Sequence, residues 1–72
     1  MNNQYEHYSM EIQWSVPQNT YIVKVPELPG CEARGDTYLE AVKHGREAIK
    51  SWIDARSEEG NPIPPPKLYM YE

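Results

Sequence analysis

The chain has 72 residues, with eleven acidic against seven basic side chains, so its formal charge at pH 7 is −4. This balance disfavours nucleic-acid binding by the bulk of the surface, because attraction to phosphates needs clustered Lys and Arg. No apolar run approaches the roughly 20 residues that span a membrane, and no signal peptide is visible at the start. The single Cys allows no internal disulfide. We therefore expect one cytoplasmic domain with no membrane partner.

A domain of this size buries a modest share of its surface and is only marginally stable alone. Small scaffolds usually rely on disulfides, a bound metal or an oligomer. The two His and the one Cys, at positions 7, 44 and 31, are too scattered to form a metal-ligand cluster. Self-association remains, so the size of the chain predicts a homo-oligomer.

Strict alternation of apolar and polar residues predicts a first strand over residues 8–16. Every even position from Tyr8 to Val16 is apolar, so one face of this strand should be buried. The run Pro17-Gln18-Asn19 favours a turn. The β-branched and aromatic residues at 20–25 predict a second strand, and so short a connection should pair the two as an antiparallel hairpin.

Residues 26–30 contain two prolines, which lack an amide hydrogen and do not suit a central strand, so we expect a rigid corner there. Small and charged residues then alternate over 31–34, which predicts a short third strand. Cys31 and Ala33 should face inward. Their small size would let a helix pack closely against the sheet.

A helix is predicted over residues 37–59, because apolar side chains recur there at helical spacing. Thr37 and Glu40 have the spacing of a capping box, and Gly60 suits the end of a helix. Gly45 lies in the apolar arc, where it indicates close approach of the backbone to the sheet or to another subunit. The opposite face carries the charged residues Glu40, Lys43, Glu47, Lys50, Asp54 and Glu58.

The proline-rich residues 61–66 predict an extended spacer, and the aromatic run at 67–71 predicts a last strand, at a sheet edge or exchanged between subunits. The expected fold class is therefore α+β with the order β-β-β-α-β, an antiparallel sheet with one helix packed on one face. One helix cannot cover both faces of a sheet or protect both of its edges. The architecture thus also predicts an oligomer.

No set of residues has the spacing of a catalytic, metal or cofactor site. His7 and His44 lack a Ser, Cys or carboxylate placed for a catalytic relay. Glu40 and His44 form an ordinary i,i+4 pair on a helix. Cys31 is better explained as a small buried residue than as a nucleophile. We therefore predict that the chain is not an enzyme and needs neither a cofactor nor a metal.

Three strings of residues are specific in combination: Val-Pro-Glu-Leu-Pro-Gly-Cys after the second strand, Gly-Asp-Thr before the helix, and Glu-Gly-Asn-Pro-Ile-Pro-Pro-Pro after it. With them, residues 8–66 resemble the N-terminal domain of the HicB family of antitoxins. The motif positions, expected to be structural, are Pro26, Leu28, Pro29, Gly30, Cys31, Gly35, Asp36, Thr37, Glu40 and Ala41. Further matching positions are Ala48, Ile49, Trp52, Gly60, Ile63 and Pro64.

The resemblance implies a partial ribonuclease-H-like fold that forms dimers or tetramers. It also implies a type II toxin–antitoxin role, the neutralisation of a small, basic, mRNA-cleaving toxin of the HicA type. Full-length relatives carry a C-terminal DNA-binding domain, for which 72 residues leave no room, so no direct DNA binding is expected. Catalysis is not implied, because the acids that would hold metal ions are missing.

Three functions were weighed. In the favoured one, an acidic oligomer covers the basic RNA-binding face of a toxin, and opposite charge speeds their association. Possible contact residues are Glu40, Glu47 and Asp54. In the alternative, the chain is an orphan oligomeric module that binds another protein or a small ligand and has no toxin partner. A nuclease remnant is the least favoured.

Overall fold

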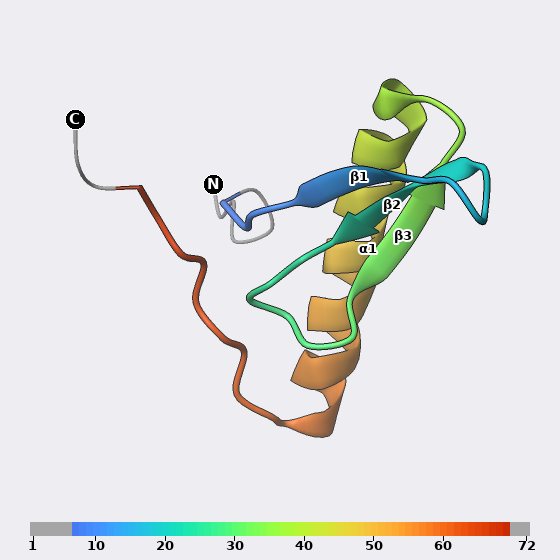
Figure 1. Ribbon diagram of the computed structural model, residues 1–72. Coiled ribbons are helices and arrows are strands. Elements are labelled where there is room, and N and C mark those ends of the chain that lie inside the picture. The colour runs from blue at the N-terminus through green and yellow to red at the C-terminus, as the bar shows by residue number, and fades with distance from the viewer. Residues whose placement is uncertain (1–6, 70–72) are drawn as a thin grey trace.

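A three-stranded antiparallel sheet followed by one long helix makes up the fold (Figure 1). The computed structural model describes residues 7–69. The elements are β1 (Glu11–Ser15), β2 (Thr20–Lys24), β3 (Glu32–Gly35) and α1 (Tyr38–Glu59), and the order of strands in the sheet is β1-β2-β3. The predicted α+β class and the order β-β-β-α are confirmed.

The β1–β2 hairpin is tighter than the sequence predicts. Its register pairs Glu11 with Lys24 at one end and Ser15 with Thr20 at the other. The amide of Asn19 donates to the Ser15 carbonyl at 2.8 Å, and Asn19 has a positive φ of 55°, a conformation that Asn tolerates well. The turn therefore takes Val16 out of the predicted strand.

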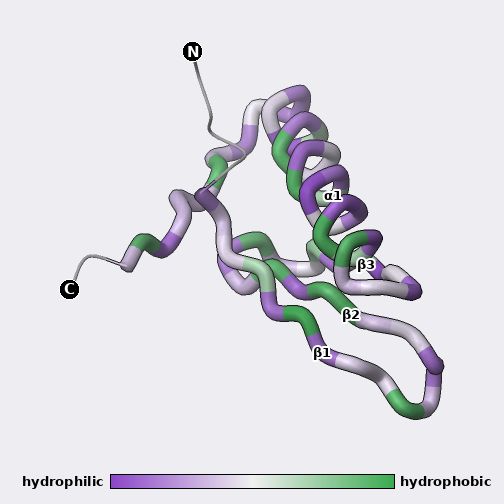
Figure 2. The backbone as a smooth tube through the Cα atoms, turned by 90° about the horizontal axis from the view of Figure 1, so that it is seen from above, coloured by the Kyte–Doolittle hydropathy of each residue, from purple (hydrophilic) through white to green (hydrophobic). Residues whose placement is uncertain are grey.

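The apolar stripe of the first strand is buried at only one end. Tyr8 is buried, whereas Trp14 is 48% exposed and Val16 is 79% exposed. Figure 2 shows the reason, because the tip of the hairpin extends beyond α1. The helix packs against β3 and β2, so the far end of β1 has no helix above it.

The core lies between the helix, the sheet and the loop that joins β2 to β3. Its central side chains, each exposed by less than 2%, are Val23, Leu28, Ile49 and Ile53. Burying an aliphatic side chain of this kind stabilises a fold by about 1.5–3 kcal/mol. Ile63, from the segment after the helix, packs against the same cluster.

Two glycines allow the helix to approach the sheet. A Cβ on Gly45 would lie 2.6 Å from the sulfur of Met10 and 3.0 Å from a methyl of Val23. A Cβ on Gly35 would lie 2.4 Å from the backbone nitrogen of Ala41, in the first turn of α1. The close approach predicted at Gly45 is therefore to the sheet of its own chain.

Both ends of the helix follow the sequence. Thr37 is the N-cap, and its Oγ1 accepts from the amide of Glu40 at 3.1 Å. The Glu40 carboxylate reaches back to the amide of Asp36 at 3.1 Å, one residue before the position it bonds in a standard capping box. At the other end, Gly60 adopts the left-handed conformation with φ 76°.

The predicted last strand does not form at residues 67–69, which correct the expected β-β-β-α-β order. Residues 61–69 run as an extended segment away from the helix, without a strand (Figure 1). The prolines of this segment lack amide donors, and the amide of Lys67 bonds the side chain of Glu27 rather than a neighbouring strand. Met70 and Tyr71, the rest of the predicted strand, lie outside the described residues.

Candidate interaction surface

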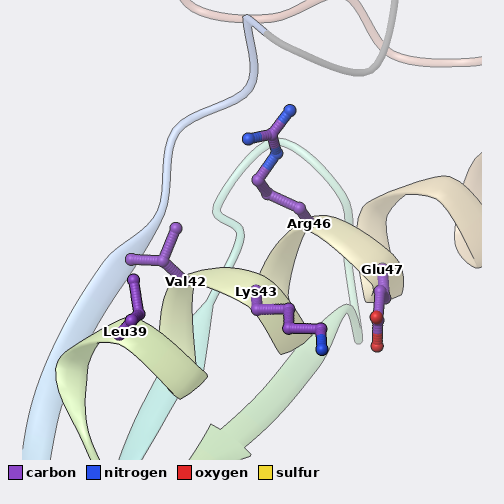
Figure 3. Close-up of a pocket in the computed structure, with 5 residues that line it drawn as sticks. All are labelled: Leu39, Val42, Lys43, Arg46 and Glu47. Carbon is purple, nitrogen blue, oxygen red and sulfur yellow. The ribbon is translucent and has the colours of Figure 1, made fainter.

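A groove runs along the side of α1 next to β1 (Figure 3). It has a volume of about 320 Å³ and is lined by Leu39, Val42, Lys43, Arg46 and Glu47. Figure 3 shows Leu39 and Val42 on the side near β1, and the carboxylate of Glu47 pointing away from Arg46. The groove thus combines an apolar wall with charges of both signs.

Three aromatic rings extend the apolar surface from the helix onto the sheet. The ring of Tyr38 stacks on Tyr21 with 4.6 Å between centroids, and Trp14 meets Tyr21 edge-on at 4.9 Å. Trp14 and Tyr38 are nonetheless exposed, as is Leu39 at 81%. We call Trp14, Tyr38, Leu39 and Val42 the apolar step, because these side chains lie where the helix rises from the uncovered end of β1.

The three acids predicted as partner contacts are spaced seven residues apart on α1, so they share one side of the helix. Their surroundings differ. The Glu40 carboxylate bonds the amide of Asp36, and Asp54 accepts from the ammonium of Lys50 at 3.1 Å. Glu47 lines the groove and is exposed. Of the three, Glu47 is therefore the best placed to meet a partner.

The motif residues build the loop between β2 and β3 and the start of α1. The loop is closed by backbone bonds in which Leu28 donates to Val25 and Cys31 donates to Leu28, at 3.1 and 3.0 Å. Gly30 supplies a positive φ of 79°. The Pro29 carbonyl accepts from the indole of Trp52 at 3.0 Å, which fastens the loop to the helix. The remaining motif residues are the exposed Pro26 and Asp36, the buried Gly35 and Ala41, and the capping pair Thr37 and Glu40.

Cys31, in the same loop, is a buried free thiol. Burial raises the pKa of this thiol, because the surrounding apolar side chains disfavour the charged thiolate. A thiol of this kind is held protonated at neutral pH. Its environment agrees with the predicted packing role.

Glu27 is the residue that sequence reasoning missed. It is only 6% exposed, and its carboxylate accepts bonds from the amide of Ser9, the hydroxyl of Ser9 and the amide of Lys67. Burial alone would raise the pKa of this carboxyl, but these hydrogen bonds favour the charged form and hold the pKa below its ordinary value. A Glu between two prolines in a loop was the available signal.

A second hollow lies beside the start of the helix, around His44. It has a volume of about 330 Å³, and its walls come from the hairpin turn, the end of β3 and α1. Nδ1–H of His44 donates to the carbonyl of Arg34 at 2.6 Å, so this ring links α1 to β3. Within residues 7–69, no three His, Cys, Asp or Glu side chains gather closely enough to hold a metal ion.

The fold and surface define a small α+β domain with an apolar step beside a charged helix face. The chain belongs to the HicB-like antitoxins of bacterial toxin–antitoxin systems, since the model of that family matches residues 8–70. In the part of the chain that the structure describes, no helix is long and apolar enough to cross a bilayer.

Curated relatives support the same assignment over part of the chain. A UPF0150 protein of Thermoplasma acidophilum is 41% identical over 44 residues, which are 61% of this chain and 64% of the relative. A UPF0150 protein of Synechocystis is 40% identical over 45 residues, 62% of this chain and 57% of the relative. An uncharacterised 14.9 kDa protein from the rep-hol intergenic region of Haemophilus phage HP1 is 41% identical over 44 residues, 61% of this chain but only 33% of that protein.

Proposed function

We propose that this chain acts as an antitoxin, binding and neutralising a small, basic, mRNA-cleaving toxin of the HicA type. Membership of the HicB-like antitoxin family is the observation that carries this proposal. The chain would act in the cytoplasm, as a homo-oligomer, by occupying the toxin's surface and without catalysing a reaction. In this role it needs no cofactor and makes no direct contact with DNA.

The charge of the chain supports a basic partner. A net charge of −4 on 72 residues attracts a cationic protein and speeds its association. On the helix, Glu47 lies exposed in the groove, next to the apolar wall of Leu39 and Val42. An acid beside an apolar wall suits a partner surface that presents a cation next to an apolar side chain.

Co-expression with the product of the neighbouring gene tests the proposal. If that product is a small basic ribonuclease, we expect the chain to restore growth to cells that express it and to co-purify with it. Glu47→Lys should weaken the complex by about tenfold, equivalent to 1.4 kcal/mol. Glu58→Lys, which makes the same charge change on the exposed end of α1, should bind as well as the unmodified chain.

An orphan module without a toxin partner is the alternative. It is favoured by the exposure of the apolar step, which suits any protein surface of matching shape. Failure to retain the neighbouring basic protein, together with no effect on its RNA cleavage, would support this alternative over the antitoxin role.

A further inference from the structure

We infer that a second copy of this chain docks along β1, so that two β1 strands pair antiparallel about a two-fold axis through Gln13. The result would be one continuous six-stranded sheet with both helices on the same face. This inference specifies the self-association named in the proposed function, and it does not require a toxin.

The outer edge of β1 is open to such pairing. The strand order β1-β2-β3 places β1 at one edge, and within residues 7–69 no strand pairs with its outer side. At the opposite edge, α1 reaches β3 through the bond from His44 to the Arg34 carbonyl. An exposed strand edge presents unpaired amides and carbonyls, which another strand satisfies best.

The side chains of β1 are self-complementary about Gln13. Antiparallel pairing centred there sets Ile12 opposite Trp14 of the second copy, and Met10 opposite Val16 of the second copy. Each of these pairs matches a partly buried apolar residue with an exposed one. The seam would therefore cover the part of the apolar stripe that α1 leaves open.

The other face of the sheet has no charge conflict in this register. Glu11 falls opposite Ser15 of the second copy, so the acids of the two strands do not face each other. Gln13 meets its own copy, and its amide both donates and accepts hydrogen bonds. Among registers that keep both helices on one face, this one pairs all five residues of β1.

A cysteine at the two-fold axis tests the register directly. Gln13 is exposed, so Gln13→Cys should leave the fold intact. Opposed residues in an antiparallel pair have Cα atoms about 4.5–5.5 Å apart, within the range of a disulfide. We expect mild oxidation to convert most of this variant into a covalent dimer, seen on a denaturing gel without reductant.

Two control variants carry the same substitution at other exposed positions. Glu11→Cys would stand roughly 13 Å from its own copy, because about four residues of strand separate them. Glu32→Cys lies on β3, at the far edge of the sheet. Both should remain monomeric on the gel, as should the unmodified chain with its buried Cys31. Equal cross-linking of either control, or no cross-linking of Gln13→Cys, overturns the inference.

A charged substitution tests the interface without a cross-link. Trp14→Lys should shift the chain from dimer to monomer in light scattering at micromolar concentration, while Leu68→Lys, at a residue of similar exposure away from β1, should not. Circular dichroism confirms that each variant is folded. A monomeric unmodified chain also overturns the inference. Retention of the toxin by that monomer would leave the proposed function intact, so the two failures are distinguishable.

Discussion

The carboxylate of Glu27 accepts a hydrogen bond from the backbone amide of Lys67 at 2.9 Å, across forty residues of sequence. The same carboxylate holds both the amide and the hydroxyl of Ser9. One side chain in the loop after β2 therefore fastens the segment before β1 and the segment after α1. The hydroxyl of Tyr8 adds a bond to the Pro64 carbonyl beside this point.

Removing this carboxylate should loosen both segments. We expect Glu27→Ala to lower the free energy of unfolding by about 1–3 kcal/mol, because it leaves buried donors without an acceptor. Urea denaturation measures the change. Glu58→Ala, at an exposed position near the end of α1, should change it by less than about 0.5 kcal/mol. Equal stability of the two variants would contradict the role of Glu27.

Glu27 should also make stability depend on acid. Its pKa is lower in the folded chain than the ordinary value of 4.5, so the unfolded chain takes up a proton first as the pH falls. Stability from this group is fully present above pH 4.5 and is lost as the pH falls through the folded pKa. Denaturation at a series of pH values should therefore show a smaller loss below pH 4.5 for Glu27→Gln than for the unmodified chain. Parallel pH profiles would rule out this linkage.

The two close-packed glycines should respond differently to alanine. At Gly35 the new Cβ meets the backbone of Ala41, which cannot move without shifting the helix. We expect Gly35→Ala to cost about 3 kcal/mol or more in thermal or urea unfolding. At Gly45 the closest atom is the flexible end of Met10, and alanine recovers about 1 kcal/mol of helix propensity. Gly45→Ala should therefore be the milder change, and the reverse order would refute this reading of the contacts.

The N-cap of α1 offers a test at the motif itself. Thr37→Ala removes the oxygen that accepts from the Glu40 amide and should destabilise the chain by about 1 kcal/mol. Ser51→Ala, exposed in the middle of the same helix, serves as the matched control and should be neutral or slightly stabilising. The helical signal in circular dichroism during thermal unfolding follows both. An unchanged midpoint for Thr37→Ala would mean that the cap contributes little.

Sequence reasoning was most accurate where the information is local. The capping spacing of Thr37 and Glu40 and the glycine at 60 placed the helix within one residue of its observed start and at its observed end. The turn residues at 17–19 predicted the hairpin. These features depend on backbone preferences and hydrogen bonds between near neighbours, so a short stretch of sequence contains what determines them.

The site was less accessible. The acids Glu40, Glu47 and Asp54 were chosen for their common helix face, but their different partners depend on what lies beside each one. The apolar step could not be anticipated, because Trp14 continues an alternation that also contains the buried Tyr8. Only the path of α1 over the sheet separates the covered end of that stripe from the open one.

By itself, the sequence determined the order of the three strands and the helix, both helix ends, and membership of the HicB-like antitoxins. The tertiary structure alone decided the burial of Glu27, the lack of a strand at residues 67–69, and the groove beside the apolar step. The physical reason is range. Periodicity, caps and turns are interactions within a few residues, whereas burial is set by which distant segments pack together.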